Sequence, residues 1–403
     1  MNAVPRPPRS PVVVVVVVVV VVAAVIAVVG CRGAPPVPSG FEARPGEVAL
    51  RVELGERLVP DEAAVLDDAR QTLLQLVEAK HQHGNDARDV HAKGHGCAQA
   101  RFVVDGDVPA ELRRGLFAAA GSYDAVVRFS TSEPSPGDDD WSPSLKGIAI
   151  KVRGVTGERF VVDDEAATQD FVFNNRPAFP LKDIVDYTAA MRVRRDGGLV
   201  AGAFVVSHLY AIPPLLLERN LIGSPLRESY WSQTPIAVGD VVTKMAVRPC
   251  VVRANGVPTV RDPDHGPDYL GQRVRAELAS TSACFDFLLQ ARPAVPADAP
   301  ARGRHVEARF PVEDATVAWS PAEAPFVRVA RLSLPRQDID DDDDASAACD
   351  ALHFTPWHAL RDHQPLGSLN RGRRMIYEVL SRYRSAHTPT PTTSTLAPPP
   401  GRP

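Results

Sequence analysis

The segment ARDVHAKGHG, residues 87–96, concentrates charged and imidazole side chains within a chain of 403 residues. Its two histidines, His91 and His95, are four positions apart and would share one face of a helix, where they could bind zinc. Gly94 and Gly96 are unfavourable inside a helix, however, and the segment lacks the glutamate of the HExxH zinc motif. The pattern therefore favours a catalytic histidine or a polar loop over a metal site.

Three further short sequence motifs follow this segment along the chain. They are VRFS at residues 127–130, KGIAIK at 146–151 and NNRP at 174–177. Together with R-x-x-H-A-K-G-x-G at residues 88–96, they resemble the haem catalases in type and in order, and the resemblance covers residues 75–387. The stretch FTPWHALRDHQPLGSLNRGRRMIYEVLSRYR, residues 354–384, is similar to the short catalase-like proteins, which lack the C-terminal nucleotide-binding domain.

The resemblance implies a catalytic role for three residues on the side of a haem where peroxide binds. His91 matches the distal histidine, which takes a proton from one peroxide oxygen and returns it to the other. Ser130 matches the hydroxyl that fixes the tautomer of that imidazole. Asn174 matches the amide donor that orients the peroxide, and Asn175 is an alternative. Taken singly, Ser130 and Asn174 are typical of an ordinary strand and an ordinary turn.

The last helical segment contains the spacing R-x3-Y-x6-R, formed by Arg373, Tyr377 and Arg384. The resemblance implies that Tyr377 is the axial ligand of the haem iron. A phenol has a pKa of about 10, and a cation four residues earlier on the same helical face favours its ionised form. Tyr383 is the alternative ligand, although no arginine precedes it at that spacing. Without the earlier blocks, a basic surface helix would be the preferred interpretation.

The implied cofactor is haem b, held by a set of arginines. Guanidinium groups bind carboxylates through two parallel hydrogen bonds, which suits the haem propionates. Arg88 and Arg384 are the predicted propionate partners, and Arg128 is a third candidate. Arg373 would support the tyrosinate ligand.

The implied activity is that of a haem oxidoreductase. It would convert two molecules of hydrogen peroxide, its small-molecule partner, into water and oxygen through a ferryl state. Two other functions remain open, because Phe179 and Pro180 stand where typical catalases have two aromatic residues. One is a peroxidase or fatty-hydroperoxide enzyme on the same fold, and the other is a non-enzymatic haem-binding lipoprotein. Catalase-like proteins tend to form homo-oligomers. The net charge of −4 gives no indication of a nucleic-acid partner.

The spacing of apolar residues predicts an α+β fold. Short segments rich in β-branched and aromatic residues, typical of an antiparallel sheet or barrel, occupy 100–106, 124–131, 147–154, 159–164, 170–174, 236–249 and 305–313. Helical patterns occupy a segment from about residue 60, then 179–192, 197–210, 283–293 and 369–387. With the resemblance, the predicted architecture is a catalase-like antiparallel β-barrel core with flanking helices and a C-terminal haem-ligand helix.

The N-terminus predicts export. Arg6 and Arg9 precede an uncharged apolar stretch, Val12–Gly30, which ends at Cys31. The sequence VVGC resembles a bacterial lipobox in which Val28 replaces the usual leucine, so Cys31 would carry a lipid. An uncleaved anchor is the alternative. Both predict a membrane-tethered protein that faces the periplasm or the extracytoplasmic space.

Four regions are therefore expected along the chain. They are a signal or anchor at 1–31, a linker at 32–58, a haem domain at 59–387 and a disordered Pro/Thr-rich tail at 388–403. The acidic run at 338–346 is expected to be a solvated loop and not a calcium site. No cysteine belongs to a CxxC pair, and Cys284 is expected to be a buried thiol.

Overall fold

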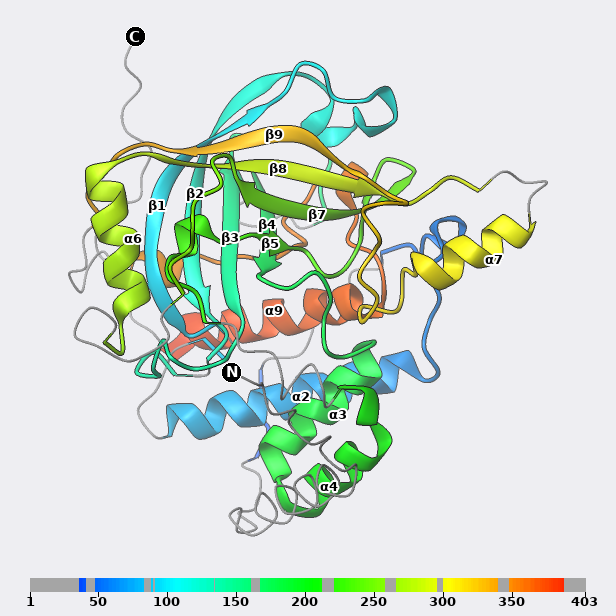
Figure 1. The fold of residues 1–403 in the computed structure, drawn as a ribbon. Helices are drawn as coiled ribbons and strands as arrows, with labels where there is room; N and C mark the ends of the chain where they lie inside the picture. Colours follow the sequence, from blue (N-terminus) through cyan, green and yellow to red (C-terminus); the bar gives the residue numbers. More distant parts are fainter. Residues whose placement is uncertain are drawn as a thin grey trace, which may run out of the picture.

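The computed structural model describes residues 36–40, 48–82, 88–89, 91–133, 135–160, 167–211, 221–257, 266–295, 300–339 and 348–387. Within them, the strands are β1 Lys93–Val104, β2 Gly121–Thr131, β3 Lys146–Arg153, β4 Thr168–Asn174, β5 Tyr230–Trp231, β6 Ile236–Val238, β7 Val241–Pro249, β8 Ala283–Ala291 and β9 Phe326–Leu334. They form one sheet in the order β5-β4-β3-β2-β1-β9-β8-β7-β6, with antiparallel pairings. Because β5 pairs with both β4 and β7, eight strands close into a barrel, which confirms the predicted fold class (Figure 1).

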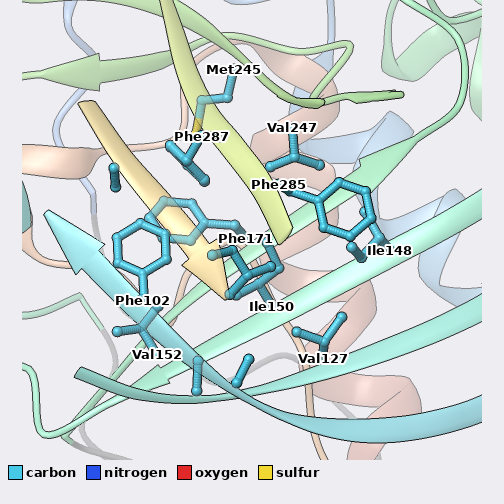
Figure 2. Packing of buried hydrophobic residues seen from close by; sticks show 14 of the residues in the cluster. Phe102, Val127, Ile148, Ile150, Val152, Phe171, Met245, Val247, Phe285 and Phe287 are labelled. Carbon is cyan, nitrogen blue, oxygen red and sulfur yellow. The ribbon is translucent and has the colours of Figure 1, made fainter. Parts of the chain in front are cut away.

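Aromatic and branched side chains fill the interior of the barrel (Figure 2). Phe171 of β4 and Phe287 of β8 are buried there, with ring centroids 4.8 Å apart. Such residues favour strands, and alternate positions of each strand point into the barrel. An eight-stranded barrel is just wide enough for these side chains. Polar residues at the intervening positions therefore face outward.

The helices are α2 Glu62–His81, α3 Ile184–Asp196, α4 Gly198–Ser207, α6 Tyr269–Ser280, α7 Pro300–Arg309 and α9 Ser368–His387. Short 3-10 turns occupy Val52–Leu54, Ala110–Leu112, Gly115–Phe117, Leu209–Ala211, Pro225–Arg227 and Arg361–His363. Three helices share one buried cluster, to which Leu73 of α2, Ile184 of α3 and Ile376 of α9 belong. Figure 1 shows α9 between the barrel and helices α2 and α3.

Buried ion pairs fix the start of α9. The Arg371 guanidinium lies 2.7 Å from Glu56, 2.6 Å from Glu62 and 3.3 Å from Glu313. Glu56 is buried, and so is Leu54. The folded body therefore includes Leu54 and Glu56, which lie within the range 32–58 that the sequence predicts as a linker. The spacing of apolar residues in the sequence does not predict this packing, because Glu56 is held by its ion pair with Arg371 and not by apolar contacts.

Two predicted elements are wrong. Residues 283–291 form strand β8 and not a helix, because Phe285, Phe287 and Leu289 are buried at every second position. Residues 300–309 form helix α7, whereas 305–313 was predicted as a strand. Val306 and Phe310, four positions apart, are buried in one cluster, which is the spacing of a helix.

Two disulfides cross-link the described residues. Cys97 pairs with Cys349, and Cys250 pairs with Cys284, with Cα atoms 5.7 Å and 5.5 Å apart respectively. The prediction of a free thiol at Cys284 is therefore wrong. The backbone N–H of Cys250 donates to the carbonyl of Cys284 at 3.0 Å, so the pairing of β7 with β8 brings these two cysteines together.

Several predictions fall on residues outside the described ranges. They concern the apolar stretch Val12–Gly30, the lipid site at Cys31, the acidic residues 340–346 and the tail at 388–403. Export and membrane attachment therefore stay predictions. Among the helices that the structure describes, none combines the length and the apolar character needed to cross a bilayer.

Candidate active site

One row of residues crosses four neighbouring strands of the barrel. Gly94 of β1 pairs with Ser130 of β2, which also pairs with Gly147 of β3. Gly147 in turn pairs with Asn174 of β4. Phe129, next to Ser130, belongs to the barrel core, so the alternation of side chains turns Ser130 outward. The row therefore lies on the outer face of the barrel.

His91 lies over this row, just before β1 begins. Its Nδ1 is hydrogen-bonded to Ser130 Oγ at 3.0 Å. A Cβ atom at Gly147 would lie 2.6 Å from His91 Cε1, so glycine is required there to leave room for the ring. The backbone of His91 is left-handed, with φ of 55°. Such a conformation is unfavourable for a residue other than glycine and is typical of functional sites.

The surroundings of His91 favour the neutral imidazole. Burial, followed by the positive charges of Arg128, Arg373 and Arg88, lowers the pKa of His91 from 6.5 to about 3. A neutral imidazole has one nitrogen that can accept a proton. Because Nδ1 is engaged with Ser130, Nε2 is the nitrogen that remains for a substrate.

This low pKa predicts a loss of stability in mild acid. The unfolded chain binds a proton at His91 more readily than the folded chain between about pH 6.5 and pH 3, so the contribution of His91 to stability falls as the pH falls through this window. From pH 7 to pH 5 we expect a loss of about 2 kcal/mol from this residue. Urea unfolding of the protein without cofactor at both pH values, compared with His91→Gln, measures it. An equal loss in the variant would contradict the assignment.

The amide of Asn174 is held by a second residue with a left-handed backbone. Asn174 Nδ2 donates to Gln233 Oε1 at 2.9 Å, and Gln233 Nε2 donates to the carbonyl of Ala178 at 2.9 Å. Gln233 is buried and has φ of 61°. Because Ala178 fixes Gln233, and Gln233 fixes Asn174, the amide of Asn174 is held in one orientation, in which Nδ2 keeps a second N–H that can donate. Asn174 Oδ1 is buried, and the Asn174 side chain interacts with His91, where it counteracts in part the lowering of the pKa.

The resemblance implied that Asn174 donates to a ligand. The second N–H of Nδ2 leaves that role possible, and it stays a prediction. Nothing in the sequence pattern selected Gln233, which lies far from the motifs in the chain. Asn175, the alternative to Asn174, is used by the fold, since its Oδ1 accepts from the backbone N–H of Lys146 at 2.9 Å.

Arg88 and Arg128 lie beside His91. Arg128 Nη2 donates to the carbonyl of His91 and to the carboxylate of Asp350, at 3.1 Å in each case. Arg88 Nη2 donates to the carbonyl of Asp350 at 3.0 Å and also to that of Leu352. Burial, then the charges of Arg384 and Arg128, lowers the pKa of Arg88 well below its ordinary value. Arg384 therefore lies within electrostatic range of this pair.

Arg88 and Arg128 each have one hydrogen-bond donor that is not satisfied by the described residues. The Nε atoms of Arg88 and Arg128 are both buried, and neither makes a hydrogen bond within the described residues. Buried polar atoms without a partner are rare in folded proteins and call for an explanation. Adjacent guanidinium groups with unsatisfied N–H donors suit an anionic group with several oxygen atoms.

Helix α9 places Tyr377 and Arg373 together, as the R-x3-Y spacing predicted. The guanidinium carbon of Arg373 lies 5.7 Å from the centroid of the Tyr377 ring. Tyr377 is partly buried against the α2–α3–α9 cluster and within electrostatic range of Arg88. Tyr383, the alternative ligand, donates its hydroxyl to Glu78 at 2.6 Å and belongs to a different buried cluster. This arrangement favours Tyr377 over Tyr383, and its role as a ligand stays a prediction.

His95 makes different hydrogen bonds from His91. Its ring is buried, and its Nε2 is hydrogen-bonded to Thr131 Oγ1 at 2.7 Å. In the part of the chain that the structure describes, no group of three or more histidine, cysteine or acidic side chains could hold a metal ion. His91 Nδ1 and His95 Nε2 are thus engaged with the hydroxyls of two different residues.

Comparisons with known proteins agree with this fold. The family model described as "Catalase" matches residues 61–197. A catalase from the Onchocerca volvulus endobacterium is 21% identical over 363 residues, which cover 79% of this chain and 65% of that protein. The crystal structure of a fungal catalase matches with a TM-score of 0.60 at 16% identity, covering 79% of this chain and 64% of the other.

A bacterial catalase structure matches with a TM-score of 0.58 at 17% identity, over 90% of this chain and 68% of the other. The chain spans about two thirds of the length of the catalases that it matches. It has the fold of the catalases, and it is similar to them at low sequence identity. The resemblance seen in the sequence is thereby confirmed.

Proposed function

We propose that the chain is a haem-dependent enzyme that converts hydrogen peroxide to water and oxygen. The observation that carries the proposal is the placement of His91. Its neutral imidazole is fixed by Ser130, fits over Gly147, and lies beside two arginines with unsatisfied donors. The catalase fold and the match to the catalase family model support the same class of activity.

The residues present fit haem b. The buried Nε donors of Arg88 and Arg128 would meet the propionates, and Arg384 would add positive charge on the same side. Tyr377 would hold the iron, with the guanidinium of Arg373 placed over its ring. When bound, the haem supplies the iron centre and the electrons that break the O–O bond.

The chain itself supplies proton transfer. His91 Nε2 would take the proton from one oxygen of the peroxide and deliver it to the other. Ser130 keeps the ring in place during both transfers. The charges of Arg128, Arg373 and Arg88 contribute to the low pKa of His91. Propionates beside these arginines would offset that charge and raise the pKa towards the working range of a base.

Asn174 would orient the peroxide. Gln233 uses one N–H of the Asn174 amide, so Asn174 can still donate its second N–H to a peroxide oxygen or accept from a peroxide O–H at Oδ1. A peroxide held there would lie in a fixed direction relative to His91. Gln233 would thus act as a positioning residue through Asn174.

Full-length protein supplied with hemin tests the proposal. We expect a Soret band and release of oxygen from hydrogen peroxide alone, measured with an oxygen electrode. A Soret band with oxidation of an organic donor or a fatty hydroperoxide, but without oxygen release, would replace the catalase assignment with a peroxidase. A Soret band without consumption of any peroxide would indicate a haem-binding protein. Absence of haem binding would contradict all three functions.

A further inference from the structure

The Cys97–Cys349 disulfide lies next to the arginines of the candidate site. Cys97 of β1 is the sheet partner of Arg128 of β2. The bond connects β1 to residues 348–352, here called the anchored segment, across a sequence separation of 252 residues. Both cysteines are buried with Val126, and Leu352 of the anchored segment packs against them.

The anchored segment holds both arginines. Arg88 Nη2 donates to the carbonyls of Asp350 and Leu352, and Arg128 Nη2 donates to the carboxylate of Asp350 at 3.1 Å. Asp350 follows Cys349 directly in the chain, so the disulfide fixes the backbone next to these acceptors. The side chain of Asp350 is half exposed, whereas that of Arg128 is buried.

The buried guanidinium groups of Arg88 and Arg128 can stay close to each other only if acceptors such as those of Asp350 and Leu352 compensate their charge. Arg88 and Arg128 repel one another, and Arg384 adds to the repulsion. Removing acceptors from buried cations leaves their charge uncompensated, which is strongly unfavourable. If the anchored segment moved away, Arg88 and Arg128 would separate or turn towards water. The two guanidinium groups would then no longer be held together through Asp350.

We propose that the Cys97–Cys349 disulfide is a positioning element of the cofactor site, which holds the anchored segment so that Arg88 and Arg128 present their donors to the carboxylates of haem. The identity of the ligand rests on the proposed function. The disulfide itself touches neither substrate nor cofactor, and it acts only through Asp350 and Leu352.

Thermodynamic linkage makes this proposal measurable in two directions. A dithiol supplies two electrons and two protons, which convert the disulfide to two thiols while the dithiol becomes a cyclic disulfide. If the intact bond strengthens haem binding by a given factor, bound haem must stabilise the bond against reduction by the same factor. A bond with a structural role alone would stabilise the fold without this coupling.

The first experiment compares two pairs of substitutions in the full chain. Cys97→Ser with Cys349→Ser removes the proposed bond, and Cys250→Ser with Cys284→Ser is the matched control. Hemin titration followed at the Soret band should give a dissociation constant about tenfold higher for the first pair and an unchanged one for the control. Equal dissociation constants for both pairs would overturn the proposal.

The second experiment uses the unmodified chain, so it does not depend on whether a variant folds. Dithiothreitol is titrated with and without zinc protoporphyrin IX, whose metal is not reduced, and the thiols of Cys97 and Cys250 are trapped and quantified by mass spectrometry. Bound porphyrin should raise the dithiothreitol concentration needed to reduce Cys97–Cys349 and leave that for Cys250–Cys284 unchanged. An equal response of the two bonds would contradict the coupling.

A third measurement separates this inference from the proposed function. Amide hydrogen exchange of residues 348–352 in the protein without porphyrin should become faster when Cys97–Cys349 is absent, and it should not change when Cys250–Cys284 is absent. If the unmodified chain binds neither hemin nor the zinc porphyrin, the proposed function fails. Exchange then still tests whether the disulfide holds the anchored segment, and unchanged exchange would refute that step.

Discussion

Replacing His91 with alanine is expected to lower the rate of oxygen release from hydrogen peroxide by about 10²- to 10⁴-fold, the usual contribution of a positioned acid–base group. The variant keeps the arginines and Tyr377, so the Soret band should persist. The loss should therefore lie in turnover and not in haem content. Oxygen-electrode rates normalised to bound haem measure the effect.

The matched control is His95→Gln. His95 lies four positions further along the same motif, but it is hydrogen-bonded to Thr131 and not to Ser130. We expect its rate per haem to stay close to that of the unmodified protein. Full activity in His91→Ala would remove His91 from the mechanism, and an equal loss in both variants would indicate a structural effect.

Replacing Tyr377 with phenylalanine is expected to weaken haem binding by about 100-fold or more, because an axial ligand contributes at least as much as the outer residues that orient it. Only a hydroxyl is removed, so the packing of the ring against α2 and α3 should persist. Hemin titration gives the affinity, and the position of the absorption bands reports the change of ligand.

Tyr383→Phe is the control from the same helix. The hydroxyl of Tyr383 donates to Glu78 on α2, so its removal should lower stability without changing the Soret band. If Tyr383→Phe abolished haem binding and Tyr377→Phe did not, the two tyrosines would exchange roles. Unchanged affinity and spectra in both variants would exclude a tyrosine of α9 as the ligand.

The barrel and the last helix could be predicted because their patterns are long and repeated. Successive short β-branched segments indicate an antiparallel sheet, and the apolar spacing of residues 369–387 indicates a helix. Residues 283–291 were assigned wrongly because a short apolar run fits a buried helix as well as a strand. The hydrogen-bonded pairing of these residues with β7 and β9 decides between them.

The site was predictable where a local motif carries it. His91 and Ser130 could be named from short blocks, and the register of β1 and β2 then brings them into contact. Gln233 and Asp350 could not be named, because each acts on a partner that is distant in sequence. Their roles depend on where β4 meets β5, and on where the anchored segment meets β1 and β2, which single-sequence patterns do not specify.

Closure of the barrel also sets an order of events during folding. β1 pairs with β9, as in the contact of Arg101 with Ser333, so strands from opposite ends of the folded body must meet. Such long-range contacts make folding slow, because much chain entropy is lost before they form. During synthesis the barrel cannot close until β9 has left the ribosome, and Tyr377 on α9 follows later still. The candidate site is therefore completed last, on a barrel whose edges have already been joined.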